Sequence, residues 1–206
     1  QGAVNVGDTD MRTVLTSVAA DSPDVLYFPI FEPEGPFIVA QSSEISGLEE
    51  TILMGADGLL SDSFPENSGP NAAGMYLSGP YVSGANYDEF LAKWDAKFGG
   101  VPPSGFHAFA YDGTNILLDA IEAVAVVQDD GTVYVPRQAL RDAIAGVTDY
   151  TGLTGKLDCS DDDYSAFGIT NASHGDCATG EALGIFEITD AEITGGNWPP
   201  EAVYTP

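Results

Sequence analysis

The sequence predicts an α/β protein in which parallel strands alternate with helices, followed by a mainly helical block. Short apolar runs alternate with segments of helical periodicity in the first 78 residues, and this order is typical of a parallel sheet with right-handed crossovers. A stretch containing Gly and Pro at residues 79–84 interrupts the alternation. We therefore expect two blocks, residues 1–78 and 86–206, joined by a hinge crossover at residues 79–85.

The elements of the first block follow from local patterns. Asp8 or Thr9 can cap a first helix, whose apolar residues then recur at helical spacing. Val25–Phe28 is a short apolar run between polar turns, which favours a buried strand. The expected elements are, in order, a helix over 11–19, a strand over 25–28, a helix over 34–43 and strands over 51–54 and 73–77.

The second block is predicted to contain three helices. The first carries Phe90, Leu91, Trp94 and Phe98 on one face and stops at Gly99. Pro136 is suited to open the third, with Leu140 and Ile144 facing inward. The inward face of the second, longer helix is expected to consist of Ala110, Thr114, Leu117, Leu118, Ile121 and Ala125. Strands are expected at residues 155–158 and 182–188.

The charge balance excludes two classes of partner. Six basic residues face 32 acidic ones, giving a formal net charge of −26. Such a surface repels nucleic-acid phosphates and anionic lipids, so we expect binding to neither. The sequence contains no apolar stretch long enough to span a membrane. It begins at Gln1 without Met, from which we expect a processed or trimmed start.

The two cysteines, Cys159 and Cys177, flank a short polar loop. A zinc site needs more ligands in closer pairs, and His174 is the only histidine nearby. A reactive thiol needs an electropositive setting, whereas this loop is acidic. We therefore expect a disulfide, which implies an oxidising compartment.

Several segments, in order along the chain, resemble the leucine/isoleucine/valine-binding proteins of ABC importers, a family of periplasmic-type solute-binding proteins. They cover most of residues 8–190, and five segments in register make the resemblance more specific than any one of them. The segments are Pro23-Asp24-Val25-Leu26-Tyr27-Phe28-Pro29-Ile30-Phe31-Glu32-Pro33-Glu34, Met54-Gly55-Ala56-Asp57-Gly58, Ala73-Gly74-Met75-Tyr76, Tyr111-Asp112-Gly113-Thr114-Asn115 and Tyr150-Thr151-Gly152-Leu153-Thr154-Gly155.

The resemblance implies a fold like that of the type I periplasmic binding proteins, with two α/β lobes, a hinge and a ligand cleft. Residues 1–78 would form most of the second lobe. Residues 86–206 would form the C-terminal part of the first lobe, with the disulfide loop and a tail. The N-terminal part of the fold would lie outside this chain, which we therefore expect to be a fragment. The implied partners are a small ligand, an amino acid or related amine or amide, and an ABC permease; the implied location is extracytoplasmic.

The resemblance also implies four ligand-binding residues. Asp57 follows a strand and matches an acidic residue that binds the ligand's amino group, although the family example is Glu; alternatively it caps its turn. Phe31 matches an aromatic residue that covers the ligand, or else belongs to the core. Glu32 departs from the family's aromatic character and adds a second acid to this wall, unless it is simply solvated. Phe106 matches an aromatic residue that closes the cleft from the first lobe, and a packed role is favoured for its neighbour His107.

No catalytic or cofactor motif is present. The sequence contains no nucleophile elbow, no zinc-protease motif, no phosphate loop and no dinucleotide fingerprint, so we expect neither an enzyme nor a cofactor. An acidic stretch around Asp158–Asp163 and Asp176 could bind calcium, but it lacks the EF-hand spacing, and a solvated loop is favoured. Two alternative functions stay open: an extracellular ligand-sensing domain of the same fold, and a secreted α/β hydrolase.

Overall fold

The structure is a computed structural model, and the chain divides into two compact units, each described here by itself. Unit 1 comprises Gln1–Tyr81 and Leu183–Pro206, and unit 2 comprises Val82–Ala182. The division between Tyr81 and Val82 falls inside the expected hinge at residues 79–85. The structure describes residues 1–102, 105–160, 177, 182–195 and 199–205.

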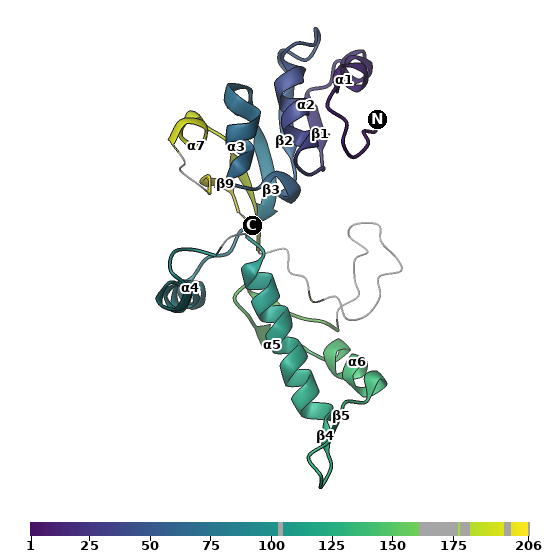
Figure 1. The fold of residues 1–206 in the computed structure, drawn as a ribbon, viewed down its shortest axis with the longest axis vertical. Helices are drawn as coiled ribbons and strands as arrows, with labels where there is room; N and C mark the ends of the chain where they lie inside the picture. The colour runs from purple at the N-terminus through teal and green to yellow at the C-terminus, as the bar shows by residue number, and fades with distance from the viewer. Residues whose placement is uncertain (103–104, 161–176, 178–181, 196–198, 206) are drawn as a thin grey trace. The chain divides into compact units, whose positions relative to one another are not determined.

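Unit 1 is built on a five-stranded mixed sheet (Figure 1). Its strands stand in the order β1 (Val25–Phe28), β2 (Ile52–Gly55), β3 (Tyr76–Pro80), β8 (Leu183–Glu187) and β9 (Ala202–Tyr204). The first three strands are parallel, with Phe28 beside Gly55 and Gly55 beside Leu77. Strand β8 runs antiparallel to β3, and β9 antiparallel to β8. The carboxyl ends of β1, β2 and β3 therefore lie at one edge of the sheet.

Helices cover one face of this sheet (Figure 1). They are α1 (Arg12–Ala19), α2 (Glu34–Ser42), α3 (Ser63–Ser68) and α7 (Asp190–Gly195), with 3-10 turns at Asp57–Leu59 and Gly69–Ala72. The core between helices and sheet includes Leu15, Val39, Phe64 and Leu77, all at 2% exposure or less. Side chains that alternate to the other face of the strands are about half exposed, including Val25, Tyr27 and Ile52. Among the described residues of unit 1, helices thus cover one face of this sheet.

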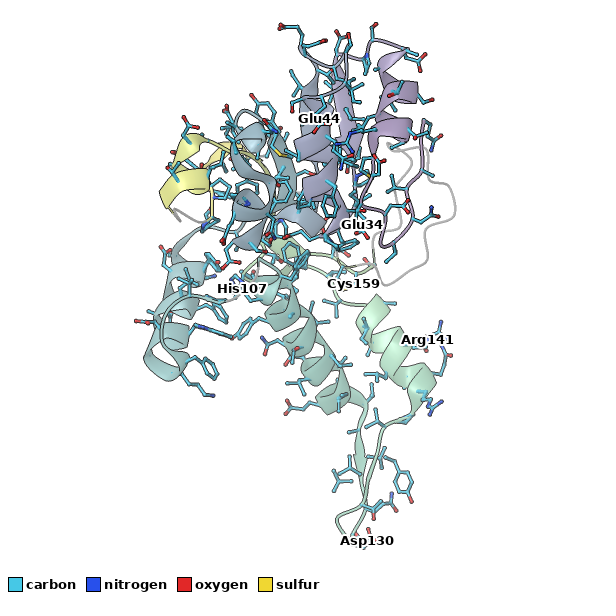
Figure 2. All side chains as sticks on the ribbon, turned by 45° about the horizontal axis from the view of Figure 1, so that its top comes forward. Glu34, Glu44, His107, Asp130, Arg141 and Cys159 are labelled. Carbon is cyan, nitrogen blue, oxygen red and sulfur yellow. A yellow bond between two sulfur atoms is a disulfide. The ribbon has the colours of Figure 1, made fainter. Side chains whose placement is uncertain are left out.

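The start of α1 is held by side chains of α2, not by the expected caps. Met11, which precedes the helix, has no side-chain cap and donates its backbone N–H to Oε1 of Gln41, at 2.7 Å. The amide nitrogen of Gln41 donates to the carbonyl of Thr9. Glu34, labelled in Figure 2, accepts the backbone N–H of Gly7. The prediction that Asp8 or Thr9 caps the helix by its side chain is wrong, because a long-range amide takes that place.

The described residues of unit 2 form three helices and two small hairpins. The helices are α4 (Ala85–Phe98), α5 (His107–Val124) and α6 (Arg137–Ala145), as expected in number and place. The hairpins are β4 (Val126–Val127) with β5 (Val133–Tyr134), and β6 (Tyr150–Thr151) with β7 (Lys156–Leu157). Asp130 marks the turn of the first hairpin in Figure 2.

The buried face of α5 differs from the predicted one. The residues it buries are Ala108, Asp112, Ile116 and Ala120, on the side where Ile116 packs with Leu157 and the disulfide. On the expected inward face, Leu117 is 41% and Leu118 is 56% exposed. Periodicity located the helix correctly, but the apolar stripe chosen from the sequence is largely exposed.

One predicted strand and one predicted block boundary differ from the structure. The strand expected over residues 73–77 is β3 at Tyr76–Pro80, because Gly74 with φ of 81° and a turn from Ala72 to Met75 occupy its first residues. The block expected over residues 86–206 is divided, since β8 pairs with β3 along its whole length and returns to unit 1. This pairing joins residues about 110 positions apart in sequence, and no local sequence pattern predicts it.

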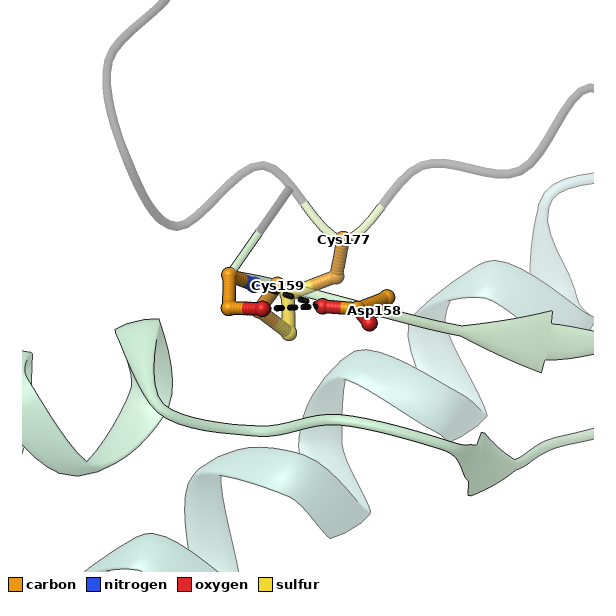
Figure 3. The surroundings of a disulfide bond; sticks show 4 residues. Asp158, Cys159 and Cys177 are labelled. Atoms are coloured by element: carbon orange, nitrogen blue, oxygen red, sulfur yellow. Dashed lines mark hydrogen bonds between the residues drawn. A yellow bond between two sulfur atoms is a disulfide. The ribbon is translucent and has the colours of Figure 1, made fainter. Parts of the chain in front are cut away.

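The expected disulfide between Cys159 and Cys177 is present (Figure 3). Cys159 is fully buried and packs with Ile116 and Leu157 in the small core of unit 2. Beside it, Asp158 accepts hydrogen bonds from the backbone and hydroxyl of Ser160. The remaining acidic residues of the loop considered for calcium, together with His174, lie outside the described residues. Within the described part of the chain, no helix is long and apolar enough to cross a membrane.

Candidate functional site

The strand ends of unit 1 bring Phe31, Glu32 and Asp57 to one edge of the sheet. Phe31 and Glu32 follow β1, and Asp57 follows β2 and opens the 3-10 turn Asp57–Leu59. In open α/β sheets, ligands bind outside the carboxyl ends of the parallel strands. Three of the four residues expected to contact ligand therefore share the edge where this architecture places binding sites.

Phe31 and Asp57 stand on turns that touch. A Cβ atom added to Gly58 would lie 2.8 Å from Cδ1 of Phe31 and 2.9 Å from the carbonyl oxygen of Ile30. The ring of Phe31 therefore packs on the backbone next to Asp57. The same side chain is 70% exposed, so it does not belong to the core. Its free surface can cover an apolar part of a bound molecule.

Asp57 presents an uncommitted carboxylate at this edge. The residue is exposed, and the turn has no side-chain cap. Within the part of the chain that the structure describes, its carboxylate accepts no hydrogen bond and forms no ion pair. The backbone below it is close to β3, since a Cβ added to Gly79 would lie 3.6 Å from Cα of Asp57. A fixed backbone with a free carboxylate is suited to pair with an ammonium group.

Glu32 is neither free nor merely solvated. Its Oε1 accepts hydrogen bonds from the hydroxyls of Ser61 and Ser63, the latter at 3.0 Å. Its Oε2 accepts the side-chain amide of Asn67 at 2.7 Å. Sequence reasoning placed Glu32 at this wall but missed its three donors, which come from α3 and the segment before it.

Phe106, the fourth expected residue, belongs to unit 2. It stands immediately before α5, its carbonyl accepts the backbone N–H of Ala110, and its side chain is 49% exposed. His107 follows it (Figure 2) and its Nε2 lies 2.7 Å from the hydroxyl of Tyr87. The ring of His107 stacks on Phe90 at 5.7 Å. His107 is thus packed among aromatic rings, in agreement with the packed role expected from the sequence.

A second feature of unit 2 is an open groove of about 680 Å³ between α4 and α5. Phe90, Trp94 and Tyr111 supply aromatic faces, with Phe90 edge-on to Tyr111 at 5.1 Å. Burial, together with nearby Asp88, raises the pKa of the Tyr87 phenol, whose ring stacks on Phe90 at 6.3 Å. The groove also includes Lys93, whose ammonium pairs with Glu89 at 2.7 Å.

Asp112, a buried residue that lines that groove, has a structural role. Its carboxylate accepts the backbone N–H of Leu153 at 2.8 Å and both the N–H and the hydroxyl of Thr154. These bonds fasten the β6–β7 turn to α5. Burial and the negative charge of Asp112 also raise the pKa of Tyr150. Among the described residues, no cluster of three or more His, Cys, Asp or Glu side chains could hold a metal ion.

A comparison with protein families decides the assignment. The family model described as periplasmic binding protein matches residues 1–168. The chain belongs to the periplasmic binding protein family. The resemblance seen in the sequence is thereby confirmed.

The relatives of this periplasmic binding protein include binding proteins for amino acids. A Leu/Ile/Val-binding protein, BraC3, from Rhizobium johnstonii is 24% identical over 127 residues, which cover 62% of this chain and 34% of the relative. The leucine binding protein LivK from Thermotoga maritima matches 98% of this chain and 51% of its own, with a TM-score of 0.70 and 21% identity. An ABC transporter solute binding protein from R. palustris, in complex with benzoate, matches with a TM-score of 0.61 and 17% identity, over 98% of this chain and 48% of its own.

These similarities confirm the expected fold class. The type I-like α/β architecture is shared with solved structures at low sequence identity, which establishes the fold. This periplasmic binding protein chain spans about half the length of those structures and about a third of the curated relative. The solved relatives differ in their named ligands, leucine in one and benzoate in the other, so the shared fold by itself does not identify a ligand.

Proposed function

We propose that the chain is part of an extracytoplasmic substrate-binding protein that delivers a small amino acid or related amine to an ABC permease. Family membership supports the binding role. The disulfide between Cys159 and Cys177 supports an oxidising, extracytoplasmic location. The named functions of the relatives, leucine binding and Leu/Ile/Val binding, support an amino acid as the ligand.

The observation that carries the proposal is the free carboxylate of Asp57 beside the exposed ring of Phe31. An ammonium group placed at Asp57 forms a charge-assisted hydrogen bond, which contributes about 1.5–3 kcal/mol. Phe31 then covers an apolar part of the same molecule. This division of roles fits a ligand with one ammonium group and an apolar portion.

The test is a ligand screen on the polypeptide as its gene encodes it. Thermal unfolding is measured against amino acids, amides, polyamines and benzoate, because a ligand that binds only the folded state raises the melting temperature. We expect stabilisation by an amino acid or a monoamine. If benzoate alone stabilises the protein, the amine-binding proposal is wrong. If no compound stabilises it while an ester or amide is hydrolysed, the binding-protein role itself is wrong.

A further inference from the structure

We propose that Glu32 is a positioning residue that joins the turn carrying Phe31 to the segment carrying Asp57, and that it does not contact the ligand. Glu32 and its three hydrogen-bond donors form the Glu32 cluster. The donors are Ser61, Ser63 and Asn67. The position of Glu32 between the two turns depends on these contacts alone. The statement about the ligand rests on the function proposed above.

The cluster uses most of the accepting capacity of the carboxylate. An ionised carboxylate offers about four lone-pair sites, and three are taken by the hydroxyl of Ser61, the hydroxyl of Ser63 and the amide of Asn67. Ser63 and Asn67 are four residues apart on α3, so both project from one face of that helix. Hydrogen bonds to a charged acceptor are about twice as strong as neutral ones. A ligand ammonium at Glu32 would have to displace donors that are already in place.

The cluster connects the two turns of the candidate site at a second point. Glu32 directly follows Phe31, whose ring packs against Gly58. Ser61 lies two residues after the 3-10 turn that Asp57 begins, and its N–H donates to the carbonyl of Leu59 at 2.9 Å. The turns are therefore joined by the ring of Phe31 on Gly58 and by the carboxylate of Glu32 on Ser61. Together the two contacts fix the orientation of Phe31 relative to Asp57. With only one of them, the two turns could rotate about that contact.

This arrangement narrows the ligand class. Of the two acids at the edge, only Asp57 has a carboxylate without a partner in the described part of the chain. A second ammonium group on the ligand therefore finds no free carboxylate at Glu32. We expect dicationic amines to gain no affinity from this position over monoamines of similar size.

The test separates the charge of Glu32 from its hydrogen bonds. In Glu32→Gln the charge is lost, but the side chain keeps an acceptor for Ser61 and Ser63. Its amide can donate to Asn67 once the Asn67 amide turns over. In Glu32→Ala all three bonds are lost. Asn67→Ala, at an exposed residue, removes one donor and serves as a second variant if Glu32→Ala does not fold.

The first readout is the NMR signal of the Gly58 α-protons in the 206-residue chain, which the ring current of Phe31 displaces. The variant Phe31→Leu gives the reference value without the ring. We expect Glu32→Gln to keep the wild-type signal, Glu32→Ala to move it toward the reference, and Asn67→Ala to move it part of the way. If Glu32→Ala leaves the Gly58 signal unchanged, or Asn67→Ala does so where Glu32→Ala does not fold, the positioning role is wrong. This arm needs no ligand, so its failure is distinct from failure of the proposed function.

The second readout is the affinity of the gene-encoded polypeptide for a monoamine and for a diamine of similar length. We expect Glu32→Gln to bind both within about twofold of the wild type, because the hydrogen bonds are retained. A loss of about tenfold or more for the diamine, with the Gly58 signal unchanged, would show that Glu32 is a direct ligand contact and would overturn the proposal.

Discussion

The ring of Phe31 lies against Gly58, so that a Cβ atom at this glycine would stand 2.8 Å from the ring and 2.9 Å from the carbonyl of Ile30. A Cβ atom at Gly58 would meet backbone on one side and an aromatic ring on the other. Moving either group to make room for it would cost free energy. Gly58 is therefore required by its surroundings. The contact also explains how a turn after β1 and a turn after β2 present Phe31 and Asp57 together.

Gly58→Ala is expected to destabilise unit 1 by about 1–3 kcal/mol, the usual cost of overpacking. Gly113→Ala is the matched control: it lies in α5 with no heavy atom within 4 Å of the added methyl group. The control should be neutral or stabilise by about 0.5–1 kcal/mol, because Ala favours the helix. Urea unfolding of both variants measures the difference, and equal stabilities would contradict the packing described.

Asp112→Ala is expected to destabilise unit 2 by about 2–4 kcal/mol, because the partly buried N–H of Leu153 and the buried N–H and hydroxyl of Thr154 lose their acceptor. Hydrogen exchange should accelerate more at the amides of Leu153 and Thr154, in the β6–β7 turn, than at the amides of α5. Asp119→Ala, at an exposed position two turns further along the helix, should change the free energy of unfolding by less than about 0.5 kcal/mol. Unchanged exchange at the two amides would refute the role assigned to Asp112.

Reduction of the disulfide between Cys159 and Cys177 is expected to lower stability by roughly 3 kcal/mol, from the entropy of closing a loop of this length. The cysteines are 18 residues apart in sequence. Melting temperatures with and without a thiol reductant measure the effect. The double variant Cys159→Ser, Cys177→Ser should melt near the reduced protein and show no response to reductant.

Ile116→Ala should cost about 2–4 kcal/mol, since Ile116 is 4% exposed and packs beside Leu157. Leu118→Ala, two positions further along α5, should cost less than about 1 kcal/mol because its side chain is 56% exposed. Thermal unfolding of the 206-residue chain distinguishes them. A cost at Leu118 equal to that at Ile116 would mean that this face of α5 is packed in solution.

Local patterns predicted much of the fold. The strand Val25–Phe28 was predicted to the residue, and α2 within one residue, because a buried strand and a helix each show in their own sequence. The helix α3 was not predicted, since Ser63–Ser68 is short and has no apolar periodicity. The pairing of β8 with β3 is long-range, and no neighbouring residue specifies it.

The candidate site was predicted only in part. Strand ends and the family resemblance led to Phe31, Glu32 and Asp57, which the fold brings to one edge. The close approach of Phe31 could not be read from Gly58, because a glycine in a turn is ordinary unless its neighbours in space are known. The donors to Glu32 were missed for a similar reason: they lie about 30 residues away in sequence.

The most direct test of the central claim, that Asp57 binds the ligand's ammonium group, is calorimetric titration of Asp57→Asn with the amine that stabilises the gene-encoded polypeptide most. We predict a loss of at least about tenfold in affinity, because a charge-assisted hydrogen bond is removed. Asp21→Asn removes the same charge from an exposed acid ahead of β1, at the other end of the strand, and should bind as the wild type does. Wild-type affinity in Asp57→Asn would contradict the account.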